Sequence, residues 1–186
     1  MYSKLIILDR DGVINEDSDD YIKNESEWHL IPGSDLAIKS LCDAGYYVAV
    51  ATNQSGISRG FFDQAELEKI HNKMHHKIEA IGGEISEIAF CPHHPDDECE
   101  CRKPKPGMLM QISKNLDNHR LDESCFIGDS ISDIRAARAV CCKPILVLTG
   151  KGHNTLLSHE NELIDVPIYE NLFEAVNELL DTHSFF

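Results

Sequence analysis

Short apolar runs recur along the chain and alternate with longer stretches of helical spacing. Each run is continuous, which is typical of strands buried on both faces of a parallel sheet. The runs are Leu5–Leu8, Tyr47–Ala51, Ile88–Cys91, Ser124–Ile127 and Ile145–Leu148. Apolar spacing and helix start and stop residues predict the following helices: Ser34–Ala44, Asp63–Ile81, Gly107–Asn115, Ile131–Ala139 and Asn171–Leu180.

The alternation of strands and helices predicts an α/β fold. It indicates a Rossmann-like, doubly wound and mostly parallel sheet in three α/β/α layers. With 186 residues, 42% of them hydrophobic, the chain is long enough for one core and short for two, so we expect a single domain over residues 1–186. No large insertion between Gly12 and Leu36 or between Ile57 and Ile85 offers a separate cap domain. We therefore expect an open site at the carboxyl ends of the strands.

The charge balance narrows the partners. The chain has 32 acidic and 17 basic residues, a formal charge of −15, which opposes binding to nucleic acid or to an anionic membrane. The first apolar run is too short for a signal peptide, and no stretch approaches the ~20 apolar residues of a membrane span. We therefore expect a monomeric cytoplasmic protein whose partner is a small molecule.

Paired carboxylates directly follow the first predicted strand. Asp9 and Asp11, in "DRDG", repel each other near a core unless a cation lies between them. Asp129 and Asp133, in "GDSISD", follow the fourth predicted strand at the same edge of the sheet. Carboxylate oxygens are ligands that Mg²⁺ prefers. The sequence therefore predicts a magnesium site, and Gly12 permits a tight turn and a close backbone approach there.

Positive and neutral polar groups follow the second and third predicted strands. Thr52 and Asn53 come after the second strand, and Lys103 and Lys105 lie in "RKPKPG". A phosphate and an attacking carboxylate repel each other until positive charge lies between them. Carboxylates, a divalent cation, a lysine and short hydrogen-bond donors at one edge therefore favour metal-assisted phosphoryl transfer.

A cysteine-histidine loop precedes these lysines. In "CPHHPDDECECRKP", residues 91–101 carry a Cys-x-His arm and a Cys-x-Cys arm. Three thiolates and one imidazole make a tetrahedral zinc set with no position left for substrate, which indicates a structural Zn²⁺ site. A cluster of free thiols or a redox pair is the competing interpretation. The predicted ligands are Cys91, His93, Cys99 and Cys101, with His94 as the alternative to His93.

Three histidines fall within the predicted helix 63–81. His71 and His75 are one turn apart, with His76 beside them, but no acidic residue completes a metal site there. We interpret them as an exposed or partly packed helix face.

Four motifs occur in order along the chain: "DRDGV", "ATNQSG", "RKPKPG" and "GDSISD". Their order and rough spacing, over about residues 5 to 150, resemble the haloacid dehalogenase superfamily of aspartate-nucleophile phosphatases. The resemblance implies that Asp9 attacks phosphorus to form an aspartyl-phosphate. It also implies that Asp11 protonates the leaving alkoxide and then deprotonates the attacking water.

The same resemblance assigns roles to the remaining motif residues. Thr52 and Asn53 would hold the phosphoryl oxygens, and Lys103 would neutralise both the nucleophile and the phosphate. Asp133 would lie behind the metal ligands and orient them. The implied ligands of Mg²⁺ are Asp9, the backbone carbonyl of Asp11, and Asp129.

The cysteine-histidine loop narrows the resemblance. Its Cys-Pro-His and Cys-x-Cys-Arg-Lys-Pro segments resemble the branch that contains D-glycero-D-manno-heptose 1,7-bisphosphate 7-phosphatases and histidinol-phosphatases. The stretches "GYYVAVATNQSGISRGFF", "CRKPKPGML" and "LTGKG" are similar to the heptose enzymes. We therefore expect removal of the 7-phosphate of the heptose bisphosphate, a step of heptose precursor synthesis for lipopolysaccharide. The alternatives are hydrolysis of histidinol phosphate and a non-catalytic zinc-containing binding module.

In that branch, loops around the phosphate site recognise the sugar phosphate. Arg102 directly follows the predicted zinc ligand Cys101, and a guanidinium binds a phosphate through two parallel hydrogen bonds. The chain departs from the branch at Ser130, where the heptose enzymes often carry a basic residue, and this weakens the expected hold on the second phosphate. The implied sugar-phosphate contacts lie in the segment Asp17–Tyr21 and beyond it: Asp17, Asp20, Tyr21, Gln54, Ser55, Arg59 and Arg102.

Overall fold

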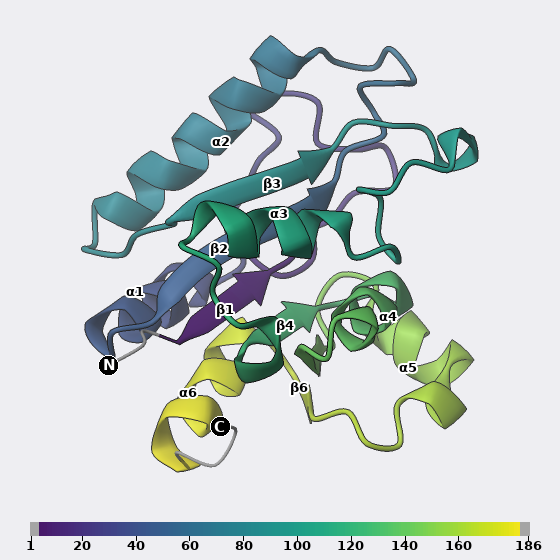
Figure 1. The fold of residues 1–186 in the computed structure, drawn as a ribbon. Coiled ribbons are helices and arrows are strands. Elements are labelled where there is room, and N and C mark those ends of the chain that lie inside the picture. Colours follow the sequence, from purple (N-terminus) through teal and green to yellow (C-terminus); the bar gives the residue numbers. More distant parts are fainter. Residues whose placement is uncertain (1–3, 183–186) are drawn as a thin grey trace.

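Six parallel strands form one sheet in the computed structural model, which describes residues 4–182 (Figure 1). The strand order is β3-β2-β1-β4-β5-β6. The expected single domain also includes residues 1–3 and 183–186, which lie outside the described residues. The strands are β1 Leu5–Leu8, β2 Tyr47–Asn53, β3 Glu87–Cys91, β4 Cys125–Gly128, β5 Lys143–Val147 and β6 Ile168–Tyr169.

Helices cover both faces of the sheet (Figure 1). They are α1 Ser34–Asp43, α2 Gln64–Glu79, α3 Gly107–Asn115, α4 Ile131–Ala139, α5 Gly152–Ser158 and α6 Leu172–Thr182, with 3₁₀ helices at Pro95–Asp97, Leu121–Glu123 and Glu160–Glu162. None of the described helices has the length and apolar character needed to cross a membrane.

The strand residues point alternately into two cores. Ile6 and Leu8 of β1 pack with α1, α2 and α6, whereas Leu5 and Ile7 pack with α3 and α4. Successive strand residues face opposite sides of a sheet, so a strand covered on both sides is apolar at every position. The predicted three-layer α/β/α fold is confirmed.

The apolar pattern does not predict strand β6 or helix α5. β6 has two residues and pairs in parallel with β5, and α5 has seven residues. Neither is long enough to display a period of 2 or 3.6 residues. The other boundaries differ from the predicted ones by at most two residues; β5, for example, begins at Lys143 rather than Ile145.

The strand order determines where a site forms. The chain runs from β1 to β2 and β3 on one side of β1 and then crosses to β4 on the other side, and ligands of such sheets bind beyond the carboxyl ends of the strands at this position. Within the described chain, residues 9–33 after β1 hold only turns and isolated bridges, and residues 54–63 after β2 hold only turns and bends. No cap domain therefore lies in either of these connections.

Candidate active site

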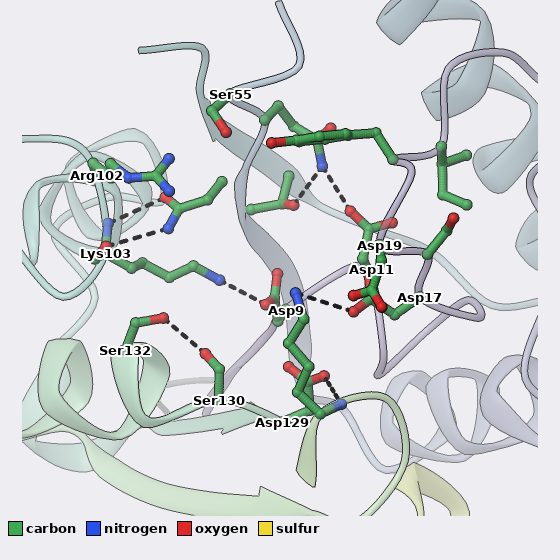
Figure 2. Close-up of a pocket in the computed structure, with 17 residues that line it drawn as sticks. Asp9, Asp11, Asp17, Asp19, Ser55, Arg102, Lys103, Asp129, Ser130 and Ser132 are labelled. Atoms are coloured by element: carbon green, nitrogen blue, oxygen red, sulfur yellow. Dashed lines mark hydrogen bonds and ion pairs between the residues drawn. The ribbon is translucent and has the colours of Figure 1, made fainter. Parts of the chain in front are cut away.

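A cavity of about 400 Å³ lies at the carboxyl ends of the central strands (Figure 2). The loops that follow β1 to β5 form its walls, so segments far apart in sequence meet there. The lining residues are Asp9, Asp11, Asp17, Ser18, Asp19, Tyr21, Ile22, Thr52, Asn53, Gln54, Ser55, Arg102, Lys103, Asp129, Ser130, Ser132 and Lys151.

Lys103 lies between two carboxylates. Its Nζ atom is 2.8 Å from Asp9 Oδ2 and 2.7 Å from Asp133 Oδ1, and its side chain is 1% exposed. The ammonium also donates to the carbonyl oxygen of Ala51 at 2.8 Å, and Asn53 exchanges two hydrogen bonds with the Lys103 backbone. Burial would lower the pKa of Lys103, but Asp133 and Asp9 hold it above its ordinary value. Lys103 is therefore a fixed positive charge beside Asp9.

Asp9, Asp129 and Asp133 form a carboxylate cluster, in which one oxygen of each lies within 4.8 Å of the others. Burial raises the pKa of Asp9 to about 7 against the opposing charge of Lys103. Burial and repulsion by Asp133 and Asp9 raise the pKa of Asp129 well above its ordinary value. Bringing a divalent cation among these oxygens relieves such repulsion, and carboxylate oxygens suit Mg²⁺.

Backbone from two loops closes tightly around Asp129. The amide of Lys151 donates to Asp129 Oδ2 at 2.7 Å. A Cβ atom at Gly12 or Gly150 would lie 2.1 or 2.2 Å from the same oxygen, and both glycines have positive φ, +82° and +56°. Only glycine fits at these positions. The predicted close backbone approach at Gly12 is confirmed.

Donors hold both carboxylate oxygens of Asp11. Arg10 Nε and Nη2 donate to Oδ1 at 3.0 and 2.8 Å, and Nη2 also lies 2.9 Å from Oδ2. Asn15 Nδ2 donates to Oδ1 at 2.8 Å. Gln54 Nε2 donates to Oδ2 at 2.8 Å and to Thr52 Oγ1 at 2.9 Å. Burial alone would raise the pKa of Asp11, but the Arg10 charge and these hydrogen bonds lower it below its usual range.

Comparisons with known proteins agree with this geometry. A family model described as polynucleotide kinase 3 phosphatase matches residues 4–153. The chain is 57% identical to the D-glycero-beta-D-manno-heptose-1,7-bisphosphate 7-phosphatase of Pseudomonas aeruginosa over 84% of this chain and 87% of that protein. It is 54% identical to the protein of the same name from Pseudomonas putida over 95% of this chain and 99% of that protein.

Solved structures give the same result. The D,D-heptose 1,7-bisphosphate phosphatase from B. bronchiseptica, complexed with magnesium and phosphate, is 46% identical, with a TM-score of 0.91 over 96% of this chain and 98% of that one. The chain belongs to the heptose-bisphosphate phosphatase family. The resemblance to haloacid dehalogenase phosphatases is also confirmed, since a had-like phosphatase from Mesorhizobium loti is 32% identical over 78% of this chain and 73% of that one, with a TM-score of 0.73.

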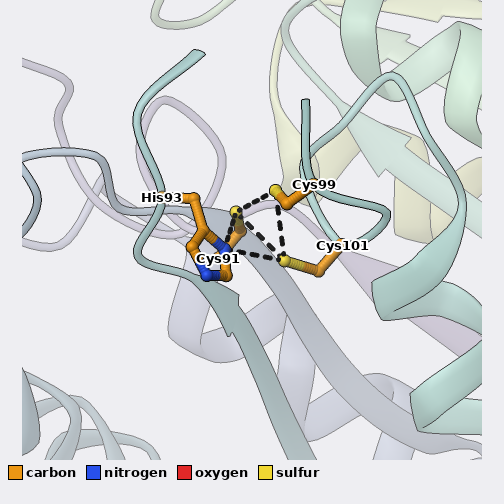
Figure 3. A group of neighbouring side chains, drawn as sticks. All are labelled: Cys91, His93, Cys99 and Cys101. Atoms are coloured by element: carbon orange, nitrogen blue, oxygen red, sulfur yellow. Dashed lines mark hydrogen bonds between the residues drawn. The ribbon is translucent and has the colours of Figure 1, made fainter. Parts of the chain in front are cut away.

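In this member of the heptose-bisphosphate phosphatase family, four side chains cluster at the end of β3 and in the loop that follows it (Figure 3). The three Sγ atoms of Cys91, Cys99 and Cys101 lie 3.3 to 3.6 Å apart. His93 Nδ1 lies 3.5 Å from Cys91 Sγ and 3.2 Å from Cys101 Sγ. Ligand atoms around a tetrahedral zinc ion are separated by roughly 3.5 to 3.8 Å, given its bond lengths. Burial and the two neighbouring thiols raise the pKa of Cys101 to about 12.

His94, the alternative ligand, lies outside this cluster. Its Nδ1 accepts a hydrogen bond from the Asp96 amide at 3.3 Å and caps the 3₁₀ helix Pro95–Asp97. The geometry therefore favours His93. Arg102 Nη1 donates to the His93 carbonyl oxygen at 3.4 Å, so the cluster directly contacts a cavity residue.

Most of the implied sugar contacts line the cavity, but Asp20 and Arg59 do not. Both side chains are exposed. Tyr21 has φ of 65°, so the chain turns there and Asp19, rather than Asp20, lines the cavity. Arg59 lies in the turn that follows β2. The residues that the structure brings to the cavity are Asp17, Tyr21, Gln54, Ser55 and Arg102.

Three further residues stand out that the motifs do not assign to the site. Lys151 lines the cavity, with its Nζ 3.2 Å from Asp17 Oδ2; its only signal in the sequence is its place in "LTGKG" after the fifth strand. Arg10 is wholly buried beside Asp11. His71, expected on an exposed or partly packed helix face, is 8% exposed and lies against Arg10, because α2 packs over the loop that follows β1.

Proposed function

We propose that this chain is a Mg²⁺-dependent phosphatase that removes the 7-phosphate of D-glycero-D-manno-heptose 1,7-bisphosphate through an aspartyl-phosphate on Asp9. One observation carries the proposal: Asp9 lies 2.8 Å from the buried ammonium of Lys103 and clusters with Asp129 in an accessible cavity. Relatives that are 50 to 57% identical are named for this activity.

The reaction has two steps on this chain's own residues. In the first, Asp9 attacks phosphorus while the bond to the leaving alkoxide breaks, and Asp11 gives that oxygen a proton. In the second, Asp11 takes a proton from water, whose oxygen bonds to phosphorus as the bond to Asp9 breaks. Lys103 lowers the repulsion between the carboxylate and the phosphate. Thr52 and Asn53 hold the phosphoryl oxygens.

Mg²⁺ suits the carboxylate cluster. Asp9, Asp129 and the backbone carbonyl of Asp11 would supply its protein oxygens. Asp133 instead forms an ion pair with Lys103 and accepts hydrogen bonds from the backbone amide and hydroxyl of Ser130, so it orients the site. When bound, the ion supplies positive charge that neutralises the transferring phosphoryl group. The magnesium and phosphate in the 46% identical relative support this role.

Zn²⁺ suits the cysteine-histidine cluster. Three sulfur atoms and one nitrogen atom at these separations complete a tetrahedral site, which leaves no position for substrate. Cys101 directly precedes Arg102 and Lys103, so a bound ion would order the segment that carries both cations. Zinc therefore acts on catalysis through position alone.

A small bisphosphate fits the charges around the cavity. Besides Lys103, its lining holds two cations, Arg102 and Lys151, that a second phosphate can reach. Ser130 adds a hydroxyl to the same lining. The formal charge of −15 opposes a polynucleotide substrate, so the description of the matching family model does not extend to this chain's substrate.

A side-by-side turnover assay with Mg²⁺ tests the substrate. We expect kcat/KM for the heptose bisphosphate to exceed that for histidinol phosphate. The reverse order would move the assignment to histidinol phosphate. Absence of phosphate release from every phosphomonoester, with zinc still bound, would favour the binding module.

Asp9→Asn tests the chemistry. The amide is a poor nucleophile, so we expect turnover to fall to background, with zinc content and thermal unfolding largely retained. Asp43→Asn, at an exposed residue of α1, is the matched control and should keep wild-type turnover. Measurable turnover by Asp9→Asn would contradict the assignment.

A further inference from the structure

Arg10 is a buried cation that the proposed reaction does not use. It is 0% exposed and is not among the residues that line the cavity. Two of its nitrogens donate hydrogen bonds to Asp11, and the third, Nη1, lies 3.3 Å from His71 Nε2. His71 lies on α2, a helix of the outer layer. A guanidinium only donates hydrogen bonds, so His71 Nε2 is the acceptor.

His71 is a rigid acceptor. Its ring packs edge-on against Phe90 at a centroid distance of 6.2 Å, and the residue is 8% exposed. Burial and the charge of Arg10 lower the pKa of His71 to about 3, so the ring is neutral and Nε2 keeps its lone pair. The order of contacts runs from α2 through His71 and Arg10 to Asp11.

Resting on the function proposed above, we propose that Arg10 and His71 are positioning residues that hold Asp11 where it exchanges a proton with the leaving oxygen and with water. Paired guanidinium donors fix the plane of a carboxylate. The Asp11 side chain is 21% exposed and faces the cavity, while Arg10 holds it from the protein interior. Neither Arg10 nor His71 lines the cavity, so both act through Asp11.

Removing His71 should affect proton transfer more than phosphoryl binding. Lys103 and the carboxylate cluster are held by other contacts and remain in place. Arg10 still donates to Asp11 but loses the acceptor that fixes its guanidinium, and Asp11 keeps one further donor on each oxygen, from Asn15 and Gln54. Its carboxylate therefore stays in the site but loses its fixed plane. Misplacement of a catalytic group by about 1 Å costs on the order of 10²-fold in rate.

Leaving groups of different basicity separate these effects. A sugar alkoxide needs a proton as the bond to phosphorus breaks, whereas p-nitrophenolate leaves without one. We would compare kcat/KM on heptose bisphosphate and on p-nitrophenyl phosphate for His71→Leu and His71→Gln. Glutamine offers an acceptor oxygen near the position of Nε2, and leucine offers none. His75→Leu, one turn further along α2, is the matched control.

We expect His71→Leu to lower kcat/KM on heptose bisphosphate by about 10-fold or more, and on p-nitrophenyl phosphate by less than about 3-fold. His71→Gln should recover most of the loss, and His75→Leu should match wild type. Arg10→Met should show the same selectivity with a fall of about 10²-fold or more. Rapid mixing of Arg10→Met with p-nitrophenyl phosphate should show a burst of p-nitrophenolate, because hydrolysis of the aspartyl-phosphate also needs Asp11.

Equal losses on both substrates, no loss on either, or a glutamine variant no better than leucine would overturn the proposal. The His71 pair keeps it testable if Arg10→Met does not fold. Failure of the proposed function is distinguishable, because wild type would then be inactive on heptose bisphosphate while still cleaving p-nitrophenyl phosphate. In that case glycerol phosphate supplies the alkoxide leaving group, and the same comparison decides the roles of Arg10 and His71.

Discussion

In the absence of Mg²⁺, Asp129→Asn should raise the free energy of unfolding of the protein. The substitution should also remove the stabilisation that Mg²⁺ gives to wild type. Asp129 is 3% exposed, and one of its oxygens lies within 4.8 Å of oxygens of Asp9 and Asp133. Two unit charges 4.8 Å apart repel by roughly 3 to 4 kcal/mol at an effective dielectric constant of about 20. Proton uptake limits this repulsion, because the pKa of Asp129 is raised. We therefore expect a gain of about 1 to 3 kcal/mol in the free energy of unfolding at about pH 8.

The gain in stability from Asp129→Asn should increase with pH. Burial and the two neighbouring carboxylates raise the pKa of Asp129 in the folded state, so the native protein binds this proton more tightly than the unfolded chain does. The resulting stability is present below about pH 4 and is lost as the pH rises through the folded-state pKa. Asparagine does not titrate. The advantage of Asp129→Asn should thus be largest at about pH 8 and vanish near about pH 4.

Asp133→Asn is the matched comparison at the same cluster, with the opposite expected outcome. Asp133 forms an ion pair with Lys103 at 2.7 Å and accepts hydrogen bonds from the backbone amide and hydroxyl of Ser130 at 3.0 and 2.6 Å. Breaking a buried ion pair costs about 3 to 5 kcal/mol, and we expect the lower end because Lys103 keeps Asp9. Denaturant unfolding of the zinc-loaded protein without added Mg²⁺, repeated with Mg²⁺, measures both variants. Destabilisation by Asp129→Asn without added Mg²⁺, or an undiminished stabilisation by Mg²⁺, would refute the reasoning.

Two further substitutions test the packing of the site. Gly12→Ala should lose at least about 1 to 2 kcal/mol of stability from backbone strain. It should also lose Mg²⁺ affinity in a titration, because its Cβ would lie 2.1 Å from Asp129 Oδ2. The control Gly45→Ala has a similar φ of +81° but open space around its Cβ, so it should keep Mg²⁺ affinity in the same titration. Cys99→Ser should lose bound zinc by metal analysis and reduce turnover, whereas the exposed Cys141→Ser should retain both, and unchanged zinc in Cys99→Ser would count against the cluster.

Features of this site that depend on strand position are predictable from the sequence, and features that depend on packing or on a local turn are not. The apolar runs locate the central strands, and parallel strand ends share one edge, so the meeting of Asp9 and Lys103 is predictable from their places after β1 and β3. The contact between Arg10 and His71 depends on how α2 packs over a loop, which neither periodicity nor motif encodes. The choice of Asp19 over Asp20 likewise depends on one local turn.

The central position of β1 in the sheet determines when the site can assemble during synthesis of the chain. β1 pairs with β2 on one side and with β4 on the other, and the amide of Asp9 donates to the Ile127 carbonyl at 3.0 Å. Asp9, the proposed nucleophile, is therefore held by a strand that the ribosome adds long after the first one. Pairing between distant segments is slow because closing the intervening chain into a loop costs conformational entropy. Catalytic competence thus arrives late in the maturation of each nascent chain, and a fragment ending after α3 carries Asp9 and Lys103 without an assembled site.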